Sequence, residues 1–265
     1  MNILRSVKSV VKFFLNEFSA ITINNSLFTI KKIIASNGSD KHIISFCLFG
    51  TDSKYFANID CCILSYKRYF PTWKIRIYVS SDLPKTVISR LLDLNCELIT
   101  MQRKGVDFRY TFWRFLVLDD DKISFAIIRD IDSIASKREQ TMVYQWIDSN
   151  LTLHIIRDHP DHIDLILAGM FGSKFDPNFN ITKAMLKFKK LNKLGIDQQF
   201  LRSIYTHYFP KILVHDIFIR YPKEQPIIIP HNSVDSFIGE INIDHVHKQR
   251  DIDALRNFYK KNLQY

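Results

Sequence analysis

Two aspartates, Asp130 and Asp132, follow directly on a short apolar segment, in the order Arg129-Asp130-Ile131-Asp132-Ser133. Aspartates spaced i, i+2 at the end of a strand can converge on one hard cation, Mg²⁺ or Mn²⁺, which in turn bridges phosphate oxygens. The same residues are also common in turns, where they hydrogen-bond their own backbone. The position of the pair at a strand end favours the metal site.

The residues around this pair alternate between strand and helix patterns. The expected elements are strands over 42–49, 74–80, 96–101 and 124–128, and helices over 53–70, 84–93 and 108–118. This alternation is typical of a mixed, mostly parallel α/β sheet of Rossmann-like type with helices on both faces. In such sheets the ligand binds at the carboxyl ends of the strands. The two aspartates are therefore predicted to lie at the ligand-binding edge.

Composition indicates a folded protein of one large or two small domains. The chain has 265 residues, 46% of them hydrophobic and 24% charged, and a formal net charge of +10, which excludes disorder and a small disulfide scaffold. Such a charge attracts nucleic acid, an anionic membrane or a diphosphate-bearing small molecule. Because no nucleic-acid recognition motif is present, we do not expect a nucleic-acid partner.

Residues 1–40 are expected to form an N-terminal amphipathic, helical extension, ahead of a main domain over 41–265. A polar break over 35–41 (ASNGSDK) separates the two. From Leu4 to Phe18 apolar residues recur at helical spacing, with lysines on another face. This pattern fits either peripheral attachment to an anionic membrane or docking of the helix on the domain core.

No segment is long and apolar enough to span a bilayer, and the N-terminus lacks the features of a signal peptide. The sequence contains four cysteines: Cys47, Cys61, Cys62 and Cys96. They form no CxxC pair and have no spacing typical of a zinc site. Buried, reduced thiols and a cytoplasmic location are therefore expected, with peripheral contact at the inner face of the membrane as an option.

Four motifs occur in a fixed order along the chain. They are Phe112-Trp113-Arg114-Phe115-Leu116 with Asp119, then 129–133 (RDIDS), 165–172 (LILAGMFG) and 195–201 (GIDQQFL). In this order and spacing the chain resembles GT-A glycosyltransferases, especially family 8 and related bacterial surface-polysaccharide enzymes. In those enzymes an aromatic-Arg helix precedes the strand that delivers a metal-binding Asp-x-Asp. The resemblance covers most of the chain, residues 42–220.

The resemblance implies a GT-A fold, Mn²⁺ or Mg²⁺ as cofactor, a nucleotide-sugar donor with UDP-sugar favoured, and a glycan or lipid-linked acceptor. It implies that Asp130, Ile131 and Asp132 bind the metal and the donor. It further implies that Asp197 or Gln198 orients the transferred sugar on the face where the acceptor attacks. A plain helix N-cap is the alternative role for Asp197.

Further groups are expected to meet the donor. Phe49, Gly50 and Thr51 follow the first expected strand, where a nucleoside would lie, although ordinary loop residues occur there too. Arg114 is predicted to point away from the core and to offer its guanidinium fork to phosphates or sugar, and Arg129 is a second candidate.

The chain departs from the family 8 pattern in two places. Arg129 stands where the family has an aliphatic or aromatic residue, and the terminal His-x-x-Gly-x-x-Lys-Pro-Trp segment is missing. The third metal ligand is therefore open between His215 and His231, of which we prefer His215. An isolated histidine is, however, more often a structural residue.

The expected function is metal-dependent transfer of a sugar from a nucleotide-diphosphate donor, in bacterial surface polysaccharide synthesis, with retention of anomeric configuration weakly favoured. One alternative is a degenerate GT-A fold that binds nucleotide or glycan without turnover. Another is a haloacid-dehalogenase-like phosphatase, although that class carries its Asp-x-Asp on the first strand. The titratable run 157–162 (RDHPDH) contains a candidate acid/base pair, and it either binds the acceptor or forms a structural ion-pair loop between strands.

Overall fold

The computed structural model describes residues 25–262 except 40, 190–191, 232 and 242–244. The strands are β1 (Ile30–Ile34), β2 (His42–Leu48), β3 (Lys74–Ser80), β4 (Glu97–Met101), β5 (Phe125–Arg129), β6 (Leu153–Arg157), β7 (Met170–Lys174) and β8 (Ile212–Asp216). The helices are η1 (Asn25–Phe28), α2 (Lys54–Ala57), α3 (Ile59–Tyr69), α4 (Lys85–Asp93), η2 (Phe108–Asp119), α5 (Lys137–Asp148), α6 (Ile181–Lys187), α7 (Ile196–Tyr208) and α8 (His245–Asn262), of which η1 and η2 are 3-10 helices.

The strands of the described residues form one sheet in the order β1-β4-β3-β2-β5-β7-β6-β8. Strands β2, β3, β4 and β5 are parallel to one another, and β6 is parallel to β8. Only β1 and β7 run antiparallel to their neighbours. The expected mixed and mostly parallel sheet is therefore confirmed.

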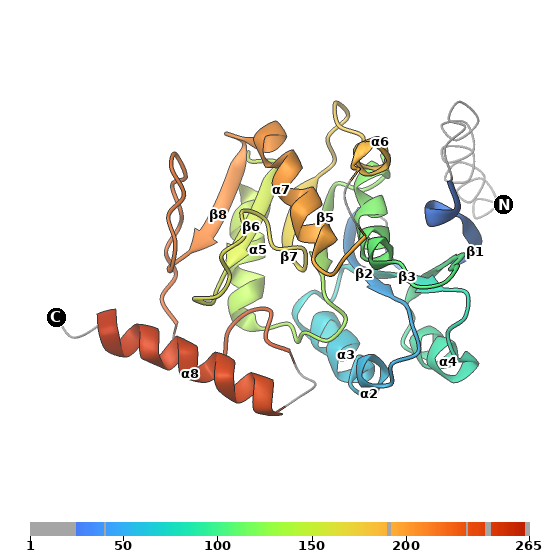
Figure 1. The fold of residues 1–265 in the computed structure, drawn as a ribbon, viewed down its shortest axis with the longest axis horizontal. Helices are drawn as coiled ribbons and strands as arrows, with labels where there is room; N and C mark the ends of the chain where they lie inside the picture. The colour runs from blue at the N-terminus through green and yellow to red at the C-terminus, as the bar shows by residue number, and fades with distance from the viewer. Residues whose placement is uncertain (1–24, 40, 190–191, 232, 242–244, 263–265) are drawn as a thin grey trace.

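Helices cover both faces of this sheet (Figure 1). Along β2, Ile43 and Cys47 pack into a core beneath η2, α6 and α7, whereas Ile44 and Phe46 pack into a second core beneath α3, α4 and α5. This two-sided burial explains why the strand reads as an unbroken apolar run in the sequence.

Three expectations need refinement. Of the cysteines expected to be buried, Cys61 is exposed, because it lies on the outer face of α3, whereas the other three are buried. The segment predicted as a helix over 108–118 is the 3-10 helix η2, in which side chains three apart eclipse, so Phe112 and Phe115 stack with ring centroids 6.0 Å apart. From the segment expected as an N-terminal extension, β1 joins the sheet as its edge strand beside β4. The amphipathic stretch from Leu4 to Phe18 lies outside the described residues.

None of the helices in the described part of the chain is long and apolar enough to cross a membrane. The C-terminal helix α8 instead lies along the outside of the domain (Figure 1), where Ile252 and Leu255 are its buried contacts.

Candidate active site

The Arg114 guanidinium joins two of the predicted site residues. Its Nη1 pairs with Oδ1 of Asp130, and its Nη2 donates to Oδ2 of Asp197 at 2.8 Å. Contrary to the prediction that it points away from the core, the Arg114 side chain is only 5% exposed, whereas that of Asp130 is 51% exposed. The buried guanidinium of Arg114 therefore binds two carboxylates, that of Asp130, which is accessible to solvent, and that of Asp197, which is covered.

The fold brings these three residues together from separate elements. Asp130 follows β5 at its carboxyl end, next to the parallel strand β2. Helix η2 lies across β2, where Ser45 Oγ donates to the Arg114 carbonyl at 2.8 Å. Asp197 is in the first turn of α7, a position that suits a negative charge because of the helix dipole. The predicted ligand-binding edge is where the three meet.

Gly169 lets the Asp130 side chain take this position. A Cβ atom on Gly169 would lie 1.9 Å from Oδ2 of Asp130, which is far inside van der Waals contact. Gly169 ends the loop that leads into β7, so a residue with a side chain there would have to displace the carboxylate.

Gln198 fixes the same loop. Its Oε1 accepts from the backbone N–H of Ala168 at 2.5 Å, and its Nε2 donates to Oδ2 of Asp164 at 3.1 Å. Arg202, one turn further along α7, pairs with the other oxygen of Asp164. Gln198 therefore ties the start of α7 to the loop that packs against Asp130.

The charges of Arg114, Asp130 and Asp197 affect the pKa values of the buried groups in the site. Burial opposes the charge on Arg114, but Asp130 and Asp197 raise its pKa above the usual value, so it is a permanent cation. Burial raises the pKa of the Cys47 thiol to about 12, with Arg114 opposing and the two aspartates adding to the shift. Cys47 is therefore a neutral thiol and no nucleophile at pH 7.

The described residues contain no group of three His, Cys, Asp or Glu side chains placed to hold a metal ion. Mg²⁺ is commonly held by one or two carboxylates together with substrate phosphates, rather than by an all-protein cage. Asp130, with its half-exposed carboxylate beside the covered Asp197, fits such an arrangement. Asp132, two residues further along the chain, is the second carboxylate near this strand end.

The residues after β2 lie beside η2. The Phe49 ring packs edge-on against Tyr110 and Trp113, with centroids 5.7 and 5.9 Å away. Gly50 has φ = 88°, a left-handed conformation that suits glycine, and Thr51 is exposed. These three residues therefore share the edge of the sheet with Arg114. Ile131, between the two aspartates, is buried.

Arg129 does not offer its guanidinium to a ligand, contrary to expectation. It is fully buried, its Nε donates to Glu139 Oε1 at 2.5 Å, and its Nη1 donates to the carbonyls of Ile128 and Phe171. It fixes α5 against the sheet, and this explains why an arginine can stand before the first aspartate.

His215, the preferred third metal ligand, has both ring nitrogens in hydrogen bonds. Its Nδ1 lies 2.8 Å from Nε2 of His154, and its Nε2 lies 2.8 Å from Oε1 of Gln145. Burial lowers its pKa to about 4. Strand β8 is three strands away from β5, or about 14 Å. His215 is therefore a structural residue, and the geometry does not support it as a ligand.

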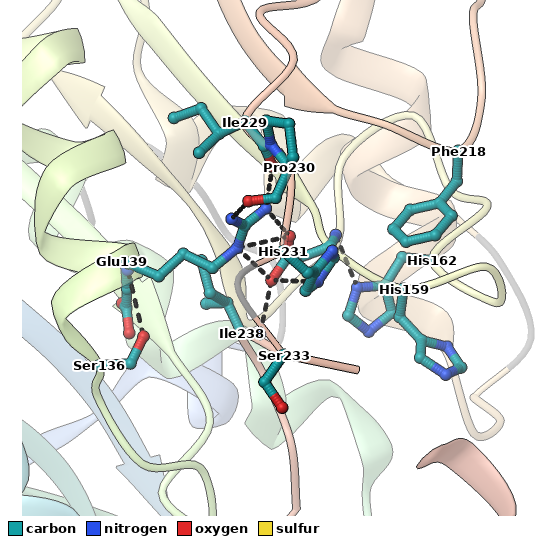
Figure 2. A network of polar contacts seen from close by, with 12 residues as sticks. Ser136, Glu139, His159, His162, Phe218, Ile229, Pro230, His231, Ser233 and Ile238 are labelled. Atoms are coloured by element: carbon teal, nitrogen blue, oxygen red, sulfur yellow. Dashed lines mark hydrogen bonds and ion pairs between the residues drawn. The ribbon is translucent and has the colours of Figure 1, made fainter. Parts of the chain in front are cut away.

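His231, the other candidate, lies in a separate polar network (Figure 2). Its Nδ1 lies 2.7 Å from the Tyr259 hydroxyl and its Nε2 lies 3.2 Å from Oδ2 of Asp158. Arg138 makes a bidentate contact with the same aspartate. Although burial opposes it, these two partners hold the pKa of Asp158 below its usual value. The network attaches α8 to the domain, and it places Nδ1 of His231 beside the Tyr259 hydroxyl and Nε2 beside the Asp158 carboxylate.

The titratable run 157–162 proves to be an ion-pair loop. Arg157 is fully buried and contacts Asp216 at 3.0 Å and Glu224 at 2.8 Å. Its Nε and Nη2 also donate to the carbonyls of Asp164 and Leu165. This run therefore supports the loop behind the site.

Sequence reasoning missed Cys47, Asp164 and Gly169 as parts of the site. Gly169 is within the small-residue turn of the 165–172 motif, so a signal for it was present. Nothing local marks Asp164, whose partners lie on α7.

No protein-family model and no curated protein matches the chain. Solved structures that are similar include glucosyl-3-phosphoglycerate synthase from Mycobacterium tuberculosis in complex with UDP (10% identity, 71% of this chain and 74% of that chain, TM-score 0.47). Another is 4-diphosphocytidyl-2C-methyl-D-erythritol synthase from Anaerococcus prevotii (10% identity, 84% of this chain and 97% of that chain, TM-score 0.47). A third is residues 1–349 of S. aureus TarS (11% identity, 84% of this chain and 72% of that chain, TM-score 0.43). Likeness at this level leaves the function to be argued from the site.

Proposed function

We propose that this protein is a GT-A-type glycosyltransferase that moves a sugar from a nucleotide-diphosphate donor, with UDP-sugar favoured, to a glycan or lipid-linked acceptor. The observation that carries the proposal is the contact of one buried guanidinium, Arg114, with both Asp130 and Asp197 at the carboxyl edge of the sheet. Ligands of α/β sheets bind at this edge.

Each residue has a role in this proposal. Asp130 and Asp132 would hold Mn²⁺ or Mg²⁺, which when bound neutralises charge on the departing diphosphate. Arg114 keeps both aspartates in place and adds a fixed positive charge near the phosphates. Asp197 and Gln198, at the start of α7, would orient the transferred sugar.

Phe49, Gly50 and Thr51 would complete the donor site. They lie on the same edge as Arg114, and the Phe49 ring already packs against η2. Stacking and backbone contacts from such residues orient a nucleoside without using charge.

The proposed setting is surface polysaccharide synthesis in the bacterial cytoplasm, with retention of anomeric configuration favoured. The amphipathic stretch of residues 4–18 would add peripheral contact with the inner face of the membrane. Deleting residues 1–20 should then reduce binding to anionic vesicles, and unchanged binding would remove this part of the proposal.

Thermal shifts with UDP, GDP, CDP and their sugars, each with and without Mn²⁺, test the donor site, because a ligand of the native state raises its apparent stability. We expect one nucleotide to raise Tm only with Mn²⁺, and the shift to vanish in Asp130→Asn. Asp161→Asn, which alters an exposed carboxylate away from Arg114, is the matched control and should keep the shift. A full shift in Asp130→Asn, or no shift with any nucleotide in the folded protein, would contradict the proposal.

A further inference from the structure

Two neighbouring loops carry the most exposed large apolar side chains of the described residues. Val106 is 80% exposed and Leu194 is 82% exposed. The backbone N–H of Phe108 donates to Oδ1 of Asn192 at 2.8 Å, which ties the two loops together. Single exposed apolar residues are ordinary on a protein surface. These two lie on loops that a hydrogen bond joins, so that one apolar partner outside the chain can cover both.

The first loop is held in its conformation. The Tyr110 hydroxyl accepts from the backbone N–H of Lys104 and donates to the Lys104 carbonyl, both at 2.8 Å. Gly105, with φ = 68°, supplies a left-handed turn before Val106. On the second loop Gly195, with φ = 75°, does the same after Leu194. Each of the two exposed side chains, Val106 and Leu194, therefore lies next to a glycine in a left-handed turn.

Lysines accompany these tips. Lys104 and Lys193 are exposed residues of the two loops, and the exposed Lys187 and Lys189 precede the second loop in the chain. The acidic residue of the first loop, Asp107, is already paired with Arg109 at 2.6 Å, and residues 177–196 contain no Asp or Glu. The surface therefore combines apolar tips with a basic rim.

We propose that loops 104–108 and 192–195 dock on an anionic lipid bilayer, with Val106 and Leu194 among the acyl chains and the lysines at the headgroups. Apolar area and charge both contribute to binding at such an interface. A nucleic acid would satisfy the lysines but leave the apolar tips in water.

Docking here has a consequence for the site. Phe108 begins η2, which carries Arg114, and Leu194 lies three residues before Asp197. When the two loops dock on the bilayer, the edge of the sheet with Arg114 and Asp197 therefore lies near the bilayer, where a lipid-linked acceptor would be. The inference deepens the membrane contact proposed above, but it does not depend on the transfer reaction, since vesicle binding needs neither donor nor acceptor.

The test is co-sedimentation of the full chain with vesicles of phosphatidylglycerol and phosphatidylcholine. We expect binding that requires phosphatidylglycerol and weakens with salt, and a loss of at least tenfold in affinity in Val106→Glu/Leu194→Glu. The matched control is Leu64→Glu/Lys85→Glu, which alters an exposed apolar residue and a lysine on α3 and α4 and should bind like the wild type.

A second measurement locates the contact. In Leu194→Trp we expect the new fluorescence to be quenched by brominated acyl chains, whereas Leu64→Trp and the native, buried Trp73, Trp113 and Trp146 are not quenched. Wild-type affinity in the double variant, with loss only on deletion of residues 1–20, would overturn this surface and leave the N-terminal contact intact. Binding to RNA without binding to vesicles would also overturn it.

Discussion

Arg114 and Asp197 stand 83 residues apart in the chain, yet Nη2 of the one donates to Oδ2 of the other at 2.8 Å. The second arm of the same guanidinium reaches Asp130. One side chain therefore connects the helix before β5, the turn after β5 and the first turn of α7. Its planar fork is what allows a single residue to serve two carboxylates.

Arg114→Lys should impair the site more than the fold. A lysine carries the charge but offers a point donor that cannot hold both carboxylates. We expect sugar transfer to fall about 100-fold, comparable to the loss of one charge-stabilising donor in other enzymes. Turnover is compared with that of Arg250→Lys, in which a 71% exposed arginine on α8 is altered and little change is expected. Transfer within twofold of the wild type would show that Arg114 has no part in the reaction.

Gly169→Ala should displace the Asp130 side chain. The new Cβ would lie 1.9 Å from Oδ2, so the carboxylate must move or the loop must shift. We expect about 1–3 kcal/mol less stability toward urea and loss of the Mn²⁺-dependent nucleotide shift. In an Asp130→Ala background the same substitution should cost less, because the side chain it meets is gone. Equal costs in the two backgrounds would refute the contact.

Arg157→Met should destabilise the domain strongly. It would leave Asp216 and Glu224 buried without their cation, a change that typically costs about 3–5 kcal/mol. Urea unfolding measures the loss, and Arg202→Met, at an exposed ion pair, should cost about 0–1 kcal/mol. Adding Glu224→Gln to Arg157→Met should restore part of the stability, since one unpaired charge is then removed. A loss of less than about 1 kcal/mol of stability in Arg157→Met would mean that the ion pairs of Arg157 with Asp216 and Glu224 are exposed to solvent.

Acid should weaken the fold through the buried His154–His215 pair. Burial lowers the pKa of His215 from 6.5 to about 4, so between these values the unfolded chain binds a proton that the native state excludes. Stability contributed by neutral His215 is thus complete above pH 6.5 and is lost as the pH falls toward 4, by about 3 kcal/mol.

His215→Gln removes this titration while keeping a polar side chain beside Gln145. Urea unfolding between pH 7 and pH 4 should therefore show a shallower decline in this variant than in the wild type. A decline in His215→Gln as steep as in the wild type would assign the acid sensitivity to other groups.

Local pattern in the sequence determined the strands and helices of the first half of the sheet and their order along the chain. The apolar runs at 42–48 and 125–129 and the alternation at 74–80 each became strands within a residue or two of the expected bounds. Buried parallel strands and their flanking helices depend on short-range periodicity and on turn residues, which a single sequence displays directly. The placement of Asp130 at a strand end followed from the same pattern.

Only the tertiary structure decided which charges meet. Arg129 and Arg114 both lie next to apolar residues in the sequence. Arg129 is buried in an ion pair with Glu139, whereas Arg114 pairs with Asp130 and Asp197. His215 lies near a strand end, as a ligand would, but its side chain faces His154 and Gln145. Such partners lie on other elements, between 10 and 83 residues away along the chain. Sheet order and strand register, which no local pattern encodes, bring them together.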